Sequence, residues 1–189
     1  MTEETFENLT DAIGHVLNDT SEEVDFGPVF SWASDNQYGD MTKADAETII
    51  SAAWNFFEKT KNTDYDSRRQ YIASALYCVI EWAKDEEIEI DLKLEQNFDD
   101  YIQRCLQNDD IVEAMNFAQY VRDNGDIAHY KKAMPLIIDR ANSEWGWSDE
   151  YNEPGIKQIF CLHDLTKDDA NQLLEIAKAN SSKRVLKEI

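Results

Sequence analysis

The chain has 189 residues, of which 42% are hydrophobic and 11% aromatic, so it carries enough apolar material for one compact core. Its 39 Asp and Glu residues outnumber its 18 Lys and Arg residues, and the formal net charge is −21. This charge argues against direct binding to nucleic acid or to anionic membranes, because neutralising phosphates requires Lys and Arg. The same charge would attract a basic protein. Solubility alone is the alternative explanation.

Cysteine usage and the first residues bear on location. The cysteines Cys78, Cys105 and Cys161 are widely spaced and odd in number. This usage indicates free thiols in a reducing compartment rather than a disulfide framework. The first ten residues are acidic and polar, without the basic and apolar segments of a secretory signal. We therefore expect a cytoplasmic location.

The first part of the chain combines a helical pattern with a long irregular stretch. Residues 2–17 carry apolar side chains at helical spacing, which predicts a helix. Over residues 18–41 this period is lost, and Gly27, Pro28 and Gly39 interrupt the pattern. The stretch holds four aromatic side chains, which argue against disorder. We predict a long loop here, or a loop with one helical turn.

A helix start follows directly. Thr42 and Asp45 have the spacing of a capping box, in which each side chain accepts a hydrogen bond from the backbone N–H of the other residue. Apolar side chains then recur at helical spacing to about Thr60. The short connection after it predicts that the next helix is an antiparallel neighbour.

That next helix, over residues 64–85, is predicted to be the central one. Between residues 71 and 83 only Ser74 and Glu81 are polar, so most of the helix circumference is apolar. A membrane span would need about 20 apolar residues, and this run is too short and has charges on both sides. The segment therefore predicts a helix that is buried in the core.

Residues 88–94 alternate between apolar and polar side chains, which is typical of a strand. The other candidate strand that could pair with them is 156–163. We favour an extended segment that leads into a helix beginning near Asp91. From Leu94 to Leu106 the helical period is clear.

Two more helices are predicted around the turn Asn124-Gly125, which ends the first of them, while Asp126 caps the second. Pro135 lies inside the second pattern and predicts a kink or a break near Ala133. The string over residues 116–133 resembles one tetratricopeptide unit around its turn. No second copy occurs about 34 residues away on either side, so no repeat-protein function is implied.

The last part of the chain holds a second acidic and aromatic loop, residues 143–155, then a helix that begins near Thr166 and a tail over 183–189 that frays or docks. Together the patterns predict an all-α fold. We expect a single domain over 1–189, an orthogonal or antiparallel bundle of about seven helices around the central helix 64–85.

Residue patterns for catalysis and metal binding are weak. The three histidines are far apart, and the chain lacks Glu-x-x-His, Cys-x-x-Cys, EF-hand and phosphate-loop patterns. Cys161 and His163 are two residues apart, a spacing that does not place both on one helix face. Acid pairs such as Asp99-Asp100 are typical of helix ends. We expect no enzyme activity, no metal and no cofactor.

The two acidic and aromatic loops are the remaining candidate site. In one interpretation the rings act as rigid anchors and the carboxylates attract a basic protein. In the alternative the aromatics fold back as small cores under the loops. An aromatic cage for a methylated ammonium is a third possibility. The candidate partner-binding residues are Asp25, Phe30, Trp32, Asp35, Tyr38, Asp40, Trp145, Trp147, Asp149 and Glu150.

These patterns favour a non-enzymatic protein that binds and neutralises a basic protein, such as a toxin, a nuclease or a nucleic-acid-binding protein. In general character the chain is similar to bacterial immunity proteins and to phage-encoded antagonists that mimic nucleic acid. The alternative is a helical scaffold or adaptor that binds a peptide or partner helix through an apolar surface.

Overall fold

The structure is a computed structural model that describes residues 8–20, 24–60, 70–107 and 111–142, together with Lys167, Ala170 and Asn171. Within these residues it contains seven α-helices and no strands, which confirms the all-α prediction. The chain divides into two compact units, residues 1–104 and 105–189. The prediction of a single domain over 1–189 stays a prediction, and each unit is described by itself.

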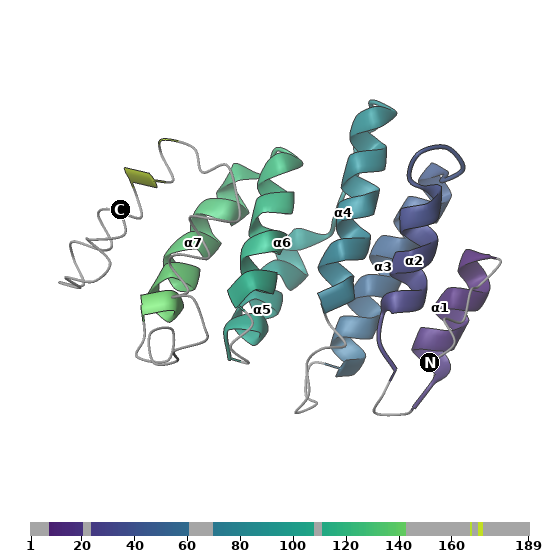
Figure 1. Ribbon diagram of the computed structural model, residues 1–189, viewed down its shortest axis with the longest axis horizontal. Helices are drawn as coiled ribbons and strands as arrows, with labels where there is room; N and C mark the ends of the chain where they lie inside the picture. Colours follow the sequence, from purple (N-terminus) through teal and green to yellow (C-terminus); the bar gives the residue numbers. More distant parts are fainter. Residues whose placement is uncertain are drawn as a thin grey trace, which may run out of the picture. The chain divides into compact units, whose positions relative to one another are not determined.

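The first unit contains α1 to α4 and most of α5 (Figure 1). Helix α2 packs against α1 and α4, and α3 packs against the same two helices. The elements are α1 (Leu9–Asn18), α2 (Gly27–Asn36), α3 (Lys43–Thr60), α4 (Gln70–Asp85) and α5 (Leu94–Gln107).

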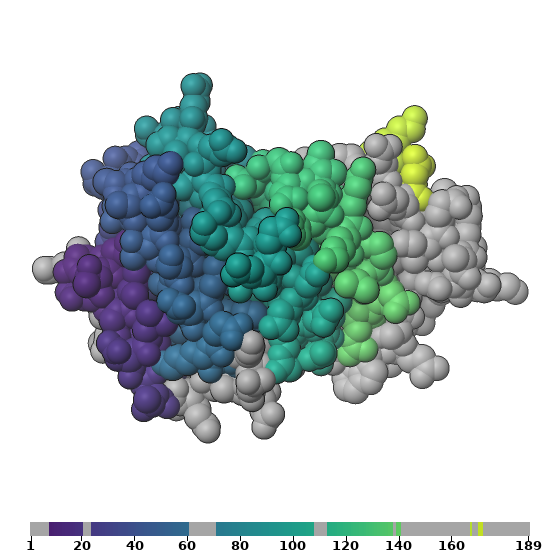
Figure 2. Space-filling view, turned by 180° about the vertical axis from the view of Figure 1, so that it is seen from behind, coloured from purple at the N-terminus to yellow at the C-terminus, as the bar shows by residue number. Residues whose placement is uncertain are grey.

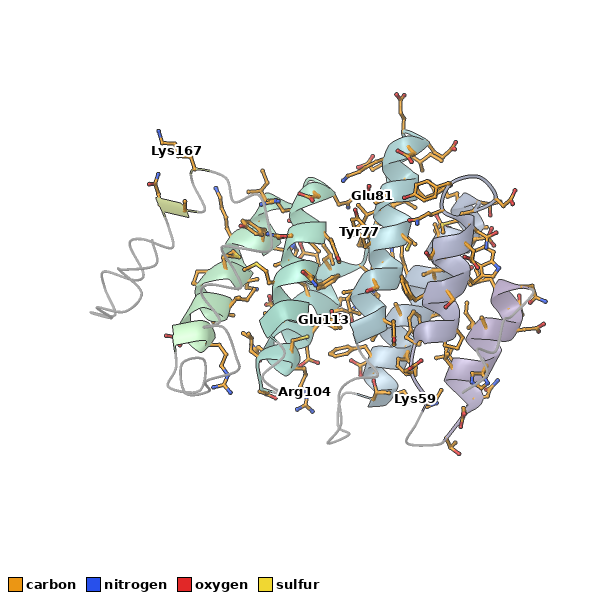
Figure 3. All side chains as sticks on the ribbon, viewed as in Figure 1. Lys59, Tyr77, Glu81, Arg104, Glu113 and Lys167 are labelled. Carbon is orange, nitrogen blue, oxygen red and sulfur yellow. The ribbon has the colours of Figure 1, made fainter. Side chains whose placement is uncertain are left out.

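Helix α4 is buried along most of its described surface, as its sequence predicts. Between residues 72 and 83 the side chains are buried except at three half-buried positions, Ser74, Tyr77 and Glu81. These three positions form one stripe at helical spacing, and Figure 3 labels Tyr77 and Glu81 on it. Residues 64–69 of the predicted helix lie outside the described part of the chain.

An aromatic cluster joins α3 to α5 inside the first unit. The ring of Tyr101 lies 6.0 Å from that of Trp54 and 5.3 Å from that of Phe57, centroid to centroid. Trp54 and Phe57 meet nearly edge to face, with an interplanar angle of 80°. All three rings are buried. Their burial and their tilted contacts favour one fixed packing of the two helices.

Both ends of α3 are held by specific hydrogen bonds. At its start, the Thr42 N–H donates to Asp45 Oδ2 at 3.0 Å and the Asp45 N–H donates to Thr42 Oγ1 at 3.2 Å, so the predicted capping box is confirmed. Near its end, Lys59 Nζ donates to the carbonyls of Val16 and Leu17 at 3.1 Å each, and also to that of Asp19 (Figure 3). A cation there satisfies the free carbonyls at the end of α1.

The predicted loop over residues 18–41 is corrected by the structure, because residues 27–36 form α2. Pro28 lies in the first turn, where its fixed φ favours a helix and its missing N–H costs nothing. Asp25 Oδ1 accepts a hydrogen bond from the Gly27 N–H at 2.8 Å. Gly27-Pro28 therefore starts a helix here and does not interrupt the chain.

Residues 88–93 form neither a helix nor a strand. Their side chains do alternate in burial, since Ile90 and Leu92 are buried while Glu89, Asp91 and Lys93 are exposed. The indole N–H of Trp54 donates to the Leu92 carbonyl at 2.8 Å, so a side chain supplies a hydrogen bond that a neighbouring strand would otherwise make. Helix α5 begins at Leu94, later than predicted, because Lys93 has a φ of +56°.

The second unit contains a helical hairpin of α6 (Ile111–Asp123) and α7 (Ile127–Asn142), which pack against each other. Gly125 forms the turn with a φ of +92°, and the Asp126 carboxylate accepts the His129 N–H at 3.1 Å, so both predicted end signals are confirmed. Pro135 does not break α7, which continues to Asn142. Arg140 Nε donates to the Leu106 carbonyl at 3.0 Å and so caps the last turn of α5.

Several predictions fall outside the described residues. These are residues 2–7 of the first predicted helix, the loop over 143–155, the candidate strand 156–163, most of the helix from Thr166 and the tail over 183–189.

Candidate functional site

The connection between α2 and α3 presents one large side chain to solvent. Tyr38 is 79% exposed, more than Ile127 and Leu136, the other exposed large hydrophobic residues in the described part of the chain. Asp35 and Asp40 on either side of it are also exposed. Exposed aromatic rings of this kind are common anchors in protein interfaces.

The backbone beneath Tyr38 is held in one conformation. The Asn36 carbonyl accepts three N–H groups, from Gly39 at 3.3 Å, Asp40 at 3.2 Å and Met41 at 3.0 Å. Asn36 Nδ2 donates in turn to the Trp32 carbonyl at 2.7 Å. Because this turn is already ordered, a partner that binds Tyr38 would lose little backbone entropy.

The other candidate residues of this region have structural contacts. Asp25 is half-buried and accepts the Gly27 N–H at the start of α2. The ring of Phe30 stacks on that of Tyr71, with centroids 5.6 Å apart. Trp32 is half-buried. Of the six candidates in this region, the structure places Asp35, Tyr38 and Asp40 in the exposed class.

Some aromatic residues of this region fold back onto the core, and one is exposed to solvent. Phe26 is fully buried against Phe56, and Phe30 packs on α4, as expected if the aromatics fold back onto the core. Tyr38 is presented outward. The partner-binding roles stay predictions, and Trp145, Trp147, Asp149 and Glu150 lie outside the described residues.

A second group of acids, at the carboxyl end of α4, lies at the same end of the first unit as Tyr38. Helices α2 and α4 are neighbours and run in the same direction, so their carboxyl ends lie together (Figure 1). The exposed acids Asp85, Glu86 and Glu87 end α4, and the residues at this end project beyond the rest of the unit (Figure 2). Lys84, which precedes them, forms an ion pair with Glu81 at 3.0 Å.

We call these residues the acidic end, which comprises Asp35, Tyr38, Asp40, Asp85, Glu86 and Glu87. Carboxylates at a helix carboxyl terminus are unfavourable, because the helix dipole already makes that terminus negative. The sequence analysis treated residues 85–87 only as a helix stop. Bases are favoured in the last turn of a helix, so three consecutive acids there were a signal in the sequence that these residues could belong to a functional site.

We next consider metal ligands, a reactive thiol and membrane-spanning helices among the described residues. No group of three or more His, Cys, Asp and Glu side chains lies close enough to hold a metal ion within them. Burial raises the pKa of the Cys78 thiol to about 11, which makes this group a poor nucleophile. Of the helices in the described ranges, none combines the length and hydrophobicity needed to cross a membrane.

The pair of Asp126 and His129 has a structural role. Asp126 Oδ2 lies 2.7 Å from His129 Nδ1, while Oδ1 of the same carboxylate accepts the His129 backbone N–H. Burial alone would raise the pKa of Asp126, but these hydrogen bonds and the charge of His129 lower it on balance. The pair thus caps the start of α7.

Comparison of the chain with protein-family models, with curated proteins and with solved structures finds no match.

Proposed function

We propose that the protein is a non-enzymatic binding protein that recognises a basic protein and neutralises it, and that the acidic end forms the contact. The observation that carries this proposal is Tyr38, a largely exposed ring on an ordered turn between two exposed carboxylates. Tyr supplies a large contact area and a hydroxyl at a low entropic cost, which suits an interface anchor.

The placement of charge supports the same proposal. Acids at the ends of α2 and α4 add to the negative potential of two helix termini, and they gain nothing from the helix dipoles. Local features that oppose stability are expected where function requires them. A field of this sign attracts a basic surface, speeds its encounter and repels acidic proteins.

Identification of the partner comes first. The full chain, immobilised, should capture a basic protein from a lysate of the cell in which it acts, and the captured protein should elute as the salt concentration is raised. Capture of only acidic or neutral proteins would overturn the charge argument. Capture that is insensitive to salt would favour the alternative, a scaffold or adaptor with an apolar binding surface.

The site is then tested with the captured partner. Asp35→Lys/Asp40→Lys should raise Kd at least about tenfold, which is about 1.4 kcal/mol, because attraction becomes repulsion. Tyr38→Ala should cost about 2 kcal/mol of binding free energy if the ring is a hot spot. The matched control is Glu95→Lys/Asp100→Lys, which makes the same change in charge on α5.

Calorimetric titration gives these affinities, and circular dichroism verifies that each variant is folded. The control should stay within about threefold of the parent at physiological salt, since long-range charge effects are largely screened there. Equal losses for the two double variants would mean that only net charge matters. An unchanged affinity for all three would remove the acidic end as the interface.

A further inference from the structure

The outward face of α7 in the second unit carries more apolar side chains than the exposed face of α5. Ile127 is 53% exposed and Leu136 is 46% exposed, and both lie on this face. The described exposed positions of the helix are Ile127, Ala128, Lys131, Lys132, Pro135, Leu136 and Asp139. Four of these seven side chains are apolar.

Helix α5 shows what a solvated face of this chain looks like. Its exposed positions carry only acids and glutamines, and no apolar residue. They are Glu95, Gln96, Asp99, Asp100, Gln103 and Gln107. The face of α7 instead combines apolar side chains with bases, although acids outnumber bases by 39 to 18 in the whole chain. An exposed face with this composition is typical of a contact surface.

The pattern of charge on this face is complementary to itself. Ile127, Lys131, Pro135 and Asp139 follow one another at intervals of four residues, so they form one row along the helix. Lys131 and Asp139 are equally far from Pro135, about 6 Å along the axis on either side. If two such helices cross in antiparallel orientation at Pro135, Lys131 of each copy lies opposite Asp139 of the other.

We propose that this face binds a second copy of the chain, through an antiparallel α7–α7 contact about a two-fold axis near Pro135. Leu136 lies next to the axis in both copies, so the two side chains bury each other at the centre. Two identical ion pairs between Lys131 and Asp139 flank them. Such an isologous contact closes on itself and gives a dimer rather than a filament.

The dimer should be weak and should depend on salt. One face of a 16-residue helix is smaller than the roughly 800 Å² per partner of a standard interface. Two chains that each carry a formal charge of −21 also repel each other, and salt screens this repulsion. Moderate salt should therefore favour the dimer over the monomer.

Sedimentation velocity of the full chain over a range of concentrations tests the proposal. The parent protein should shift from monomer toward dimer as its concentration rises at moderate salt. Leu136→Glu should lower the association constant at least about tenfold, because it places two carboxylates at the axis. Gln103→Glu adds the same charge on α5 and should associate like the parent. A parent that is monomeric at every concentration and salt level would overturn the proposal.

A charge exchange tests the register. Lys131→Asp alone and Asp139→Lys alone should each dimerise less than the parent, since like charges then face each other. An equimolar mixture of the two variants should form a heterodimer. In it the introduced aspartate of the first variant lies opposite the introduced lysine of the second, and the unchanged Asp139 of the first lies opposite the unchanged Lys131 of the second.

The same exchange distinguishes register from net charge. If net charge alone governed association, Asp139→Lys would associate more strongly than the parent. That result, or a mixture that stays monomeric, would contradict the antiparallel contact. Circular dichroism verifies that each variant is folded.

Discussion

Neighbouring residues of α4 differ in how deeply their side chains are buried. Leu76 and Val79 have no exposed surface, whereas Ser74, two positions before Leu76, is half-buried on the polar stripe of the helix. An uncompensated charge in the core is costly, because the carboxylate loses its hydration and gains no partner. The same substitution should therefore have very different effects at these positions.

Leu76→Asp and Val79→Asp should each unfold the protein, since the expected loss is a large part of the roughly 5–15 kcal/mol that stabilises an ordinary domain. Ser74→Asp should remain folded, with a cost of about 1 kcal/mol or less. Far-ultraviolet circular dichroism with urea titration measures both outcomes. Cooperative unfolding of Leu76→Asp near the parent midpoint would mean that α4 is not the core of the first unit.

Several helix ends in this structure are capped, some by side chains of adjacent residues and others by side chains that are distant in the sequence. Thr42 and Asp126 cap the helices that follow them, while Lys59 and Arg140 reach the carbonyl ends of other helices, α1 and α5. Each contact satisfies backbone groups that a helix terminus leaves free. Bases at the carbonyl ends are also favoured by the helix dipole.

Asp126 makes one of these caps sensitive to pH. Its pKa is lowered from the ordinary value of 3.8, so the native state favours the ionised carboxylate more than the unfolded state does. The resulting stabilisation is present above about pH 4 and is lost as the pH falls through the folded pKa. Asp126→Ala should cost about 1 kcal/mol at neutral pH.

Urea titrations of the parent and of Asp126→Ala between neutral pH and about pH 3 measure this effect. The difference in free energy of unfolding between them should shrink at the acid end of the range. Asp40→Ala, in an exposed turn, is the matched control and should differ little from the parent at neutral pH. A difference that grows on acidification would contradict the assigned role of the carboxylate.

At the scale of the whole molecule, the excess of acid is the dominant property. A formal charge of −21 on 189 residues makes the compact state repel itself, and the fold tolerates this repulsion because its helices bury apolar side chains. Screening should therefore stabilise the protein as well as weaken its attraction to a basic partner.

The thermal midpoint of the dilute protein should rise as NaCl is raised from low ionic strength to about 0.3 M, where screening extends to about 6 Å. Circular dichroism at increasing temperature measures it, at concentrations too low for association. KCl should act like NaCl at equal ionic strength if screening is the cause. A midpoint that falls with salt would mean that ion pairs stabilise the fold more than the net charge destabilises it.

The sequence by itself determined the helices whose signals are local. The capping box at Thr42, the apolar circumference of residues 71–83 and the stop at Gly125 each act through neighbouring residues, and each is confirmed. For the candidate site it named Tyr38 and its two flanking acids, which the structure finds exposed, while their binding role stays a prediction. Separating them from Asp25 and Phe30 required knowing which side chains pack.

Long-range contacts decided the rest. Helix α2 has few buried residues of its own and forms in contact with α1 and α4, so its period is hidden in the sequence. Residues 88–93 form neither a helix nor a strand, and the distant Trp54 donates a hydrogen bond to the Leu92 carbonyl. The acidic end exists because α2 and α4 run in the same direction (Figure 1). Periodicity and caps report interactions within a few residues, whereas these features depend on groups that only the tertiary fold brings together.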